Sequence, residues 1–136
     1  MTRREEVVLV VHRPGPEFLV LLRSPESHGY WHLVAGGIED GEAPAEAALR
    51  ELDEETALEP LRFEPLPLVL AYSRDDGYRM RVHPFVVEAP AGWEPTLNEE
   101  HVDYRWLDEE SAVELLEFPE PRRAVREVAR RLADVR

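Results

Sequence analysis

Short apolar runs separated by turn residues dominate the first half of the chain, and they predict β-strands. Two such runs, EEVVLVVH at residues 5–12 and EFLVLLR at residues 17–23, flank a Pro-Gly-Pro segment and predict a hairpin. The sequence Arg-Asp-Asp-Gly at residues 74–77 predicts a further turn. Other strands are expected at residues 31–35, within residues 62–73, at residues 78–89 and at residues 102–107.

Other segments have the spacing of apolar residues that is typical of helices. The first covers residues 44–57, the second begins after the capping residue Asp108 and ends near Glu117, and the third covers residues 122–135. The third helix is expected to turn these apolar side chains inward: Ala124, Val125, Val128, Leu132 and Val135. Strands interleaved with helices predict one domain over residues 1–136, of the α/β (α+β) class, with helices on both faces of a mixed sheet.

Acidic residues gather on the helix predicted at residues 44–57. At about 100° per residue, one arc should pack on the sheet, and it contains Ala45, Ala48, Leu49, Leu52 and Thr56. The neighbouring arc carries the carboxylates of Glu51, Glu54 and Glu55, and the small Ala47 there is expected to leave room above them. Like charges three and four positions apart repel by about 0.2–0.5 kcal/mol per pair, so this grouping indicates a function.

A hard divalent cation would relieve that repulsion. Mg²⁺ prefers oxygen ligands, and such a site both clamps phosphate oxygens and activates water. The glycine loop before the helix supplies backbone groups nearby, and Glu42 is spaced to brace Arg50 or another part of the site. The alternative is a solvated acidic face with Glu46–Arg50 and Arg50–Glu54 pairs, which leaves the fixed offset of the glycine loop unexplained.

Composition and charge exclude several classes of function. The net charge of −13 at pH 7 argues against nonspecific binding to nucleic acids, which requires a basic surface. The absence of Cys excludes disulfides, thiolate nucleophiles and Cys-based zinc sites. No apolar run approaches a membrane span, and no signal-peptide cleavage site is evident, so a cytoplasmic protein is expected. Its expected partner is a phosphorylated small molecule bound through cations, and the sequence is compatible with a homodimer.

The residues around the acidic helix resemble a known family. The spacing is that of the Nudix box, which is matched by Gly36, Glu42, Arg50, Glu51, Leu52, Glu54, Glu55 and Leu58. The chain departs from the usual pattern at Ala57, where the box has a Gly that would relieve a left-handed turn. The resemblance implies the Nudix fold, an α/β/α sandwich around a mixed β-sheet.

The resemblance also implies a reaction and a site. The reaction is hydrolysis of a nucleoside diphosphate linked to another group, by attack of water on phosphorus, with Mg²⁺ or Mn²⁺ as cofactor. By family position, Glu51, Glu54 and Glu55 hold metal, and Glu51 is the variable candidate for both ligand and base. Arg50 orients a glutamate, the Gly36 carbonyl completes a metal shell, and Glu42 is structural.

Sequence within and beyond the box resembles one branch of the family, the bacterial dihydroneopterin triphosphate pyrophosphatases, also described as dATP pyrophosphohydrolases. The similar segments are WHLVAGGIEDGE at residues 31–42, EETAL at residues 54–58 and EEHVDYRWLD at residues 99–108. This likeness selects Glu100 as a further metal ligand and implies a (d)NTP or pterin triphosphate, cut to a monophosphate and pyrophosphate. The alternatives are another Nudix substrate, such as ADP-ribose or a dinucleotide polyphosphate, and a non-catalytic module that senses nucleotides.

Further residues are candidates for contact with substrate. Arg23 follows the second predicted strand and is placed either to meet phosphate or simply at the surface. Trp31 and Tyr78 are candidates to stack on a base or pterin, with core packing favoured for Trp31. Arg3 and Arg4 are weaker candidates because chain termini fray. The histidines are interpreted as structural, with His101 a neighbour of the metal ligands.

Overall fold

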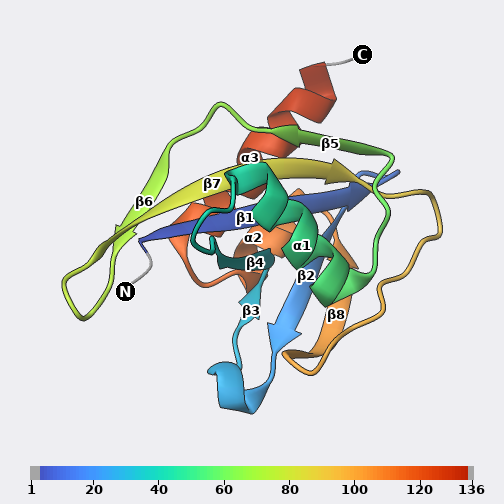
Figure 1. Cartoon of the computed structure of the whole chain (residues 1–136). Coiled ribbons are helices and arrows are strands. Elements are labelled where there is room, and N and C mark those ends of the chain that lie inside the picture. Colours follow the sequence, from blue (N-terminus) through green and yellow to red (C-terminus); the bar gives the residue numbers. More distant parts are fainter. Residues whose placement is uncertain (1–3, 135–136) are drawn as a thin grey trace.

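Two long parallel strands form the centre of the sheet. The computed structural model describes residues 4–134, in which β1 (Glu5–Arg13) lies parallel to β7 (Arg79–Glu88), with Val7 opposite His83. The middle of β1 is a continuous run of buried apolar residues, as expected for a strand covered on both faces. Both strands run through the middle of the molecule (Figure 1).

The far side of β1 carries shorter antiparallel strands. β2 (Glu17–Arg23) and β4 (Val34–Gly37) each pair with β1, so the predicted hairpin of the first two strands is confirmed. β2 in turn pairs with β3 (Trp31–His32) on one stretch and with β8 (His101–Leu107) along most of its length. β8 therefore brings the loop before it, residues 90–100, back to the N-terminal half of the chain.

The other edge of β7 pairs with two short strands, β5 (Arg62–Pro65) and β6 (Leu70–Ser73). The predicted segment at residues 62–73 thus contains two strands. They are separate because Pro67 lies between them and a proline nitrogen cannot donate to a strand ladder. The expected turn at residues 74–77 joins β6 to β7 as a hairpin.

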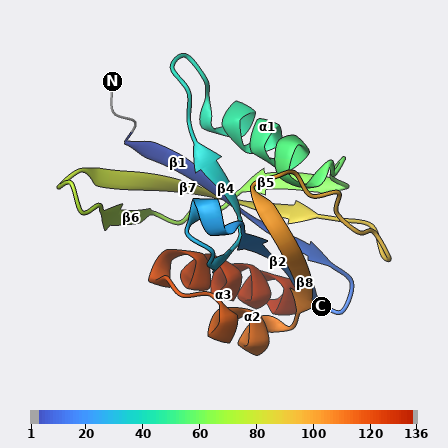
Figure 2. The same ribbon diagram turned by 90° about the horizontal axis from the view of Figure 1, so that it is seen from below.

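Helices cover both faces of the mixed sheet. α1 (Pro44–Thr56) lies on one face, and α2 (Glu109–Leu115) and α3 (Pro119–Asp134) lie together on the other (Figure 2). A 3₁₀ turn at Pro25–Ser27 follows β2. The α/β/α sandwich around a mixed sheet is confirmed. None of the helices within residues 4–134 is long and apolar enough to cross a membrane.

Alternate residues of the central strands point to opposite faces and form two separate cores. Val7 and Leu9 pack beneath α1, whereas Val8 and Val10 pack against α2 and α3. α3 begins at Pro119, three residues earlier than predicted, because proline is well suited to the first turn of a helix. Its predicted inward residues Ala124, Val125 and Val128 are buried, Leu132 is partly buried against the same core, and Val135 lies outside the described residues.

α1 is rotated about its axis relative to the arc predicted from sequence. Ala45 and Leu49 are exposed, so the prediction that they face the sheet is wrong. Ala47 and Glu55 are buried instead, and Ala47 fills the core rather than leaving room above the carboxylates. The reason is β4, which lies under the acidic arc and supplies the Ala35 N–H to Glu55, so the helix turns toward it.

The turn that ends α1 holds a residue in a strained conformation. Ala57 has φ 62° and ψ 23°, and its N–H donates to the Asp53 carbonyl at 2.9 Å. The left-handed region costs a residue with a Cβ about 1–2 kcal/mol. The chain therefore keeps the left-handed turn that the box usually builds with glycine, at a cost in stability.

We expect Ala57→Gly to raise the free energy of unfolding by roughly 0.5–1 kcal/mol, because the relief of strain exceeds glycine's greater freedom in the unfolded chain. Urea-induced unfolding measures this change. The matched control is Ala45→Gly at an exposed helical position, which should lower the free energy of unfolding by about 1 kcal/mol. A loss of stability in both variants would contradict the left-handed conformation of Ala57.

Candidate metal and catalytic site

The end of β4, at Ala35, Gly36 and Gly37, forms the floor of the site, and the carboxylate of Glu51 from α1 lies against it. Gly36 lies opposite Val7 in the sheet, and a Cβ on residue 36 would overlap the carboxylate of Glu51. The Glu51 side chain is 12% exposed. The glycine is therefore required by space, since only a residue without a side chain allows the Glu51 carboxylate to lie against the backbone.

Arg50 ties the glycine loop to α1. Its Nε and Nη2 donate to the two carboxylate oxygens of Glu42 at 2.8 and 3.0 Å, so the predicted brace by Glu42 is present. Nη2 also donates to the Gly37 carbonyl at 3.0 Å, while Nη1 donates to Glu51 at 2.7 Å and to Glu54 at 3.2 Å. The hydrogen bonds that Arg50 donates to Glu42, and then to Glu51, hold the pKa of Arg50 above its usual range. The rigid guanidinium thereby fixes the direction of the Glu51 carboxylate.

Glu55 is a carboxyl group buried beneath the same floor. Its side chain is 1% exposed, its Oε1 accepts from the Ala35 N–H at 3.4 Å, and its Oε2 has no hydrogen-bond partner. Burial raises the pKa of Glu55 far above its ordinary value, and the neighbouring Glu51 and Glu100 raise it further. A buried carboxylate beside other carboxylates is costly to ionise unless a cation accompanies it.

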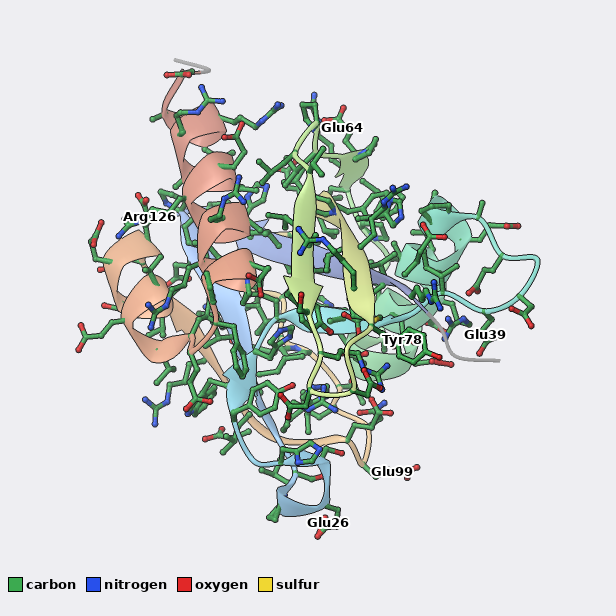
Figure 3. All side chains as sticks on the ribbon, turned by 90° about the vertical axis from the view of Figure 1, so that its left-hand side faces the viewer. Glu26, Glu39, Glu64, Tyr78, Glu99 and Arg126 are labelled. Atoms are coloured by element: carbon green, nitrogen blue, oxygen red, sulfur yellow. The ribbon has the colours of Figure 1, made fainter. Side chains whose placement is uncertain are left out.

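The other predicted ligands lie at the rim of this floor. Glu54 is half exposed, with its carboxylate directed to Arg50. Glu100, in the loop before β8, lines the same cleft as Gly36 and Glu51. Its neighbour Glu99 extends outward from the loop (Figure 3) and does not line the cleft. Two adjacent acids therefore face different surroundings, and the role of Glu100 as a metal ligand stays a prediction.

The donors at this site fit a hard divalent cation. Within residues 4–134 no three acidic or histidine side chains already converge as a metal cage. The buried Oε2 of Glu55 nevertheless has no hydrogen-bond partner among the described residues, and a cation beside it would favour the ionised carboxylate. The space over Gly36 admits the Glu51 carboxylate. Carboxylate and carbonyl oxygens are the ligands that Mg²⁺ prefers. The arrangement can thus hold a cation at one end of the cleft.

A cleft of about 1010 Å³ is lined by Gly36, Glu51 and Glu100. Its walls combine aromatic and basic side chains, among them Arg23, Tyr30, Tyr72, Arg74 and Phe118. The hydroxyl of Tyr72 donates to Glu6 at 2.6 Å, and burial followed by this hydrogen bond raises the pKa of Tyr72 above its usual range. Tyr30 packs edge-on against Phe118, with ring centroids 5.2 Å apart. Fixed aromatic faces beside basic groups suit a flat ring joined to phosphates.

Of the predicted substrate contacts, Arg23 lies in the cleft wall. Its Nε donates to the Ser27 carbonyl at 2.9 Å, and its guanidinium lies 5.3 Å from the centroid of the Tyr30 ring. These contacts hold the loop at residues 24–30 against the end of β2. The position of Arg23 agrees with a phosphate contact, a role that stays a prediction.

The two predicted aromatic contacts lie outside the cleft lining. Trp31 packs against the core beneath α2 and α3, with the Arg105 guanidinium 4.8 Å from its ring, which is the core packing favoured for it from sequence. Tyr78 lies at the end of the turn between β6 and β7 (Figure 3), with the Arg4 guanidinium 4.6 Å from its ring. Arg3 lies outside the described residues.

Sequence reasoning missed the aromatic residues that do line the cleft. Tyr72 follows Leu70 by two positions in β6, so strand alternation could have placed it on the same face. Tyr30 precedes β3 and reaches the cleft only through the path of the loop, which no local pattern encodes. Neither is one of the two aromatic residues predicted from sequence, Trp31 and Tyr78.

The sandwich, the glycine loop that receives a helical carboxylate and the cleft above them define a class of metal-assisted hydrolase domains. The NUDIX domain model matches residues 2–128, and the chain belongs to the Nudix family. As a Nudix hydrolase it acts on pyrophosphate bonds, and the family generally uses a divalent metal.

Known proteins with similar sequences differ in their activities. The chain is 37% identical over 129 residues to an octanoyltransferase of Myxococcus xanthus, a match that covers 88% of the chain and 34% of that protein, so the chain spans about a third of its length. It is 33% identical over 117 residues to an asymmetrical bis(5'-nucleosyl)-tetraphosphatase of Mus musculus, covering 82% of the chain and 77% of the relative. A dihydroneopterin triphosphate diphosphatase of Haemophilus influenzae is 27% identical over 124 residues, covering 82% and 78%.

Solved structures show the same fold. A binary complex of an Ap4A hydrolase from C. elegans superposes with a TM-score of 0.82 at 25% identity, over 96% of this chain and 98% of that one. The dihydroneopterin triphosphate pyrophosphohydrolase of E. coli superposes with a TM-score of 0.81 at 22% identity, over 92% and 94%, and this likeness concerns the fold alone.

Proposed function

We propose that the chain is a Mg²⁺-dependent pyrophosphohydrolase that cuts a nucleoside or pterin triphosphate between the α and β phosphates. The products are a monophosphate and pyrophosphate, and Mn²⁺ is an alternative cofactor. The observation that carries the proposal is a cleft lined by Glu51, Glu100, Arg23 and Tyr72, with the buried Glu55 carboxyl group close to both glutamates.

In this proposal the carboxylates of Glu51, Glu55 and Glu100 hold the cation, with Glu54 at the outer side and the Gly36 carbonyl adjacent. When bound, the cation polarises phosphate oxygens and lowers the pKa of a bound water. Arg50 Nη1 donates to Glu51 Oε1 at 2.7 Å and orients this carboxylate, which in this proposal accepts a proton from water.

The walls of the cleft suit the rest of the substrate. Arg23 supplies a positive charge for the phosphate chain, which the carboxylates alone would repel. Tyr72, locked by its hydrogen bond to Glu6, offers a fixed ring face to the base or pterin. Because the ring is already held, little side-chain entropy is lost when a planar group stacks on it.

A dinucleotide polyphosphate is a second candidate substrate, for one structural reason. The cleft has a second aromatic side chain, Tyr30, on a different segment from Tyr72. Two aromatic faces suit a substrate with two bases, and the relative from Mus musculus is a bis(5'-nucleosyl)-tetraphosphatase.

A substrate panel with Mg²⁺ decides between these candidates. The panel contains dATP, dihydroneopterin triphosphate, diadenosine tetraphosphate and ADP-ribose, and the phosphate products are separated by anion-exchange chromatography. Pyrophosphate release from a triphosphate is expected, with no turnover in EDTA. Turnover of diadenosine tetraphosphate alone would select the second candidate. Turnover of ADP-ribose alone, or release of single phosphate from the γ position, would contradict both, and binding of nucleotides without turnover would indicate a sensing module.

The loop before β8 allows a test of the proposed ligand set. Glu100→Ala should raise the Mg²⁺ concentration needed for half-maximal rate by at least about tenfold, since even residues that only support a metal ligand cost about 10–100-fold. Glu99→Ala, the matched control on the exposed side of the same loop, should do little. Metal titrations of the rate measure both variants. Near-wild-type behaviour of both would exclude the loop as a source of ligands, and a larger effect at Glu99 would reverse their assignment.

A further inference from the structure

Unpartnered polar atoms gather at one place beneath the cleft. Within residues 4–134 the buried side-chain nitrogen and oxygen atoms without a hydrogen-bond partner are Oε2 of Glu55 and both ring nitrogens of His101. The two side chains are each 1% exposed, and His101 Nε2 lies 3.8 Å from Glu55 Oε1. Buried polar groups in folded proteins almost always have partners. This pair therefore has a role that its packing alone does not explain.

The start of β8 explains how the imidazole reaches Glu55. His101 is the first residue of β8 and lies opposite Arg23 of β2, with its side chain buried. Glu100, one residue earlier, is exposed and lines the cleft. Glu100 lies in the turn that precedes β8, so the two neighbouring side chains face different surroundings. The same loop thus places a carboxylate at the wall of the cleft and an imidazole beneath its floor.

We infer that His101 is a positioning residue that holds the Glu55 carboxylate for the divalent cation, an inference that rests on the proposed function. A neutral imidazole carries one N–H, and with that proton on Nε2 the ring donates to Oε1 of Glu55. A movement of about 1 Å brings the two atoms to hydrogen-bond distance. Oε2 is then left for the cation. Hydrogen bonds of this kind orient metal ligands and raise metal affinity.

The test compares side chains that keep or remove the donor. Gln places its amide nitrogen near the position of Nε2, Asn places its amide near Nδ1, and Met keeps the volume without a donor. Mn²⁺ affinity is measured without substrate, by electron paramagnetic resonance of free Mn²⁺. His101→Met and His101→Asn should weaken Mn²⁺ binding by about 10–100-fold, whereas His101→Gln should stay within a few-fold of wild type. His12→Met is the control. His12 lies near the C-terminal end of β1, whereas Gly36 pairs with Val7 nearer its start, so this substitution should leave the affinity unchanged.

A double-mutant cycle makes the inference specific to Glu55. In a Glu55→Gln background, His101→Met should cause no further loss of Mn²⁺ affinity, because the group that His101 positions is already changed. Thermal unfolding in EDTA and near-ultraviolet circular dichroism check that each variant is folded. If His101→Met does not fold, His101→Asn is used in its place in the cycle. Wild-type affinity in His101→Asn, or equal losses in both backgrounds, would overturn the inference. Failure of the wild-type protein to bind Mn²⁺ would instead overturn the proposed function.

Discussion

Glu55→Gln is expected to slow hydrolysis of the pyrophosphate bond by about a hundredfold or more, the loss that follows from removing several kcal/mol of metal-based stabilisation. The amide keeps the size of the side chain and removes its charge at the most buried position of the site. Steady-state rates at several Mg²⁺ concentrations measure the effect. Glu59→Gln, an equal change of charge at an exposed position just after α1, should leave the rate unchanged. Activity of Glu55→Gln within a few-fold of wild type at limiting Mg²⁺ would show that Glu55 is not a ligand.

The same substitution should stabilise the fold when divalent cations are chelated. The pKa of Glu55 is raised in the folded protein above the value near 4.5 that it has when unfolded. The folded state therefore binds this proton more tightly, and stability falls as pH rises above 4.5. One pKa unit corresponds to about 1.4 kcal/mol, so at pH 7 in EDTA the variant should exceed wild type by at least about that much. At pH 4, where Glu55 is protonated in both states, the two proteins should unfold at similar temperatures.

Gly36→Ala should also lower kcat by about a hundredfold, through displacement of a carboxylate rather than its loss. The added Cβ would occupy the space of the Glu51 carboxylate, which must move away from both Arg50 and Glu55. A displacement of about 1 Å at a catalytic group can cost about 10²-fold in rate. The fold should survive, since the group that must move is the end of a flexible side chain. Rates and thermal unfolding are both measured.

Gly41→Ala is the matched control and should show the opposite pattern. Gly41 has φ +80°, and nothing lies within 4 Å of a Cβ built on it. Its replacement should destabilise the loop by about 1 kcal/mol or more while leaving kcat unchanged, because the cost is conformational and not steric. If Gly36→Ala behaved like Gly41→Ala, with a stability loss and normal kcat, the overlap with Glu51 would have no functional importance.

The order of strands and helices follows from local patterns, and this is why the layered fold was predictable. The unbroken run of apolar residues in β1 indicates a strand buried on both faces, and the Pro residues at 65 and 67 mark an edge. The rotation of α1 was not predictable in the same way. Leu49 is apolar and lies on the arc that hydrophobicity alone would bury, yet it is exposed because β4 contacts the acidic side of the helix. Hydrophobic pattern measures the preference of one helix, whereas burial depends on what the neighbouring strand presents.

The site was predictable as far as the box extends. Spacing indicated that Glu42 braces Arg50 or another part of the site, and the bidentate contact shows that its partner is Arg50. Spacing could not tell that Glu55 lies deep and Glu54 lies at the surface, because that difference comes from the rotation of α1. The walls of the cleft come from segments far apart in sequence, such as Tyr30 and Tyr72, so only the folded arrangement brings them together.

The parallel pairing of β1 with β7 has a consequence for synthesis on the ribosome. Val7 lies opposite His83 in the sheet, so β1, with its unbroken apolar run, leaves the ribosome long before its parallel partner β7 exists. At about 5–20 residues per second the wait lasts several seconds. During that time the edge of β1 that pairs with β7 has no partner, and the charged residues Glu5, Glu6 and Arg13 at the ends of the strand disfavour pairing with other nascent chains. We expect newly made chains truncated before β7 to be bound by chaperones or to aggregate.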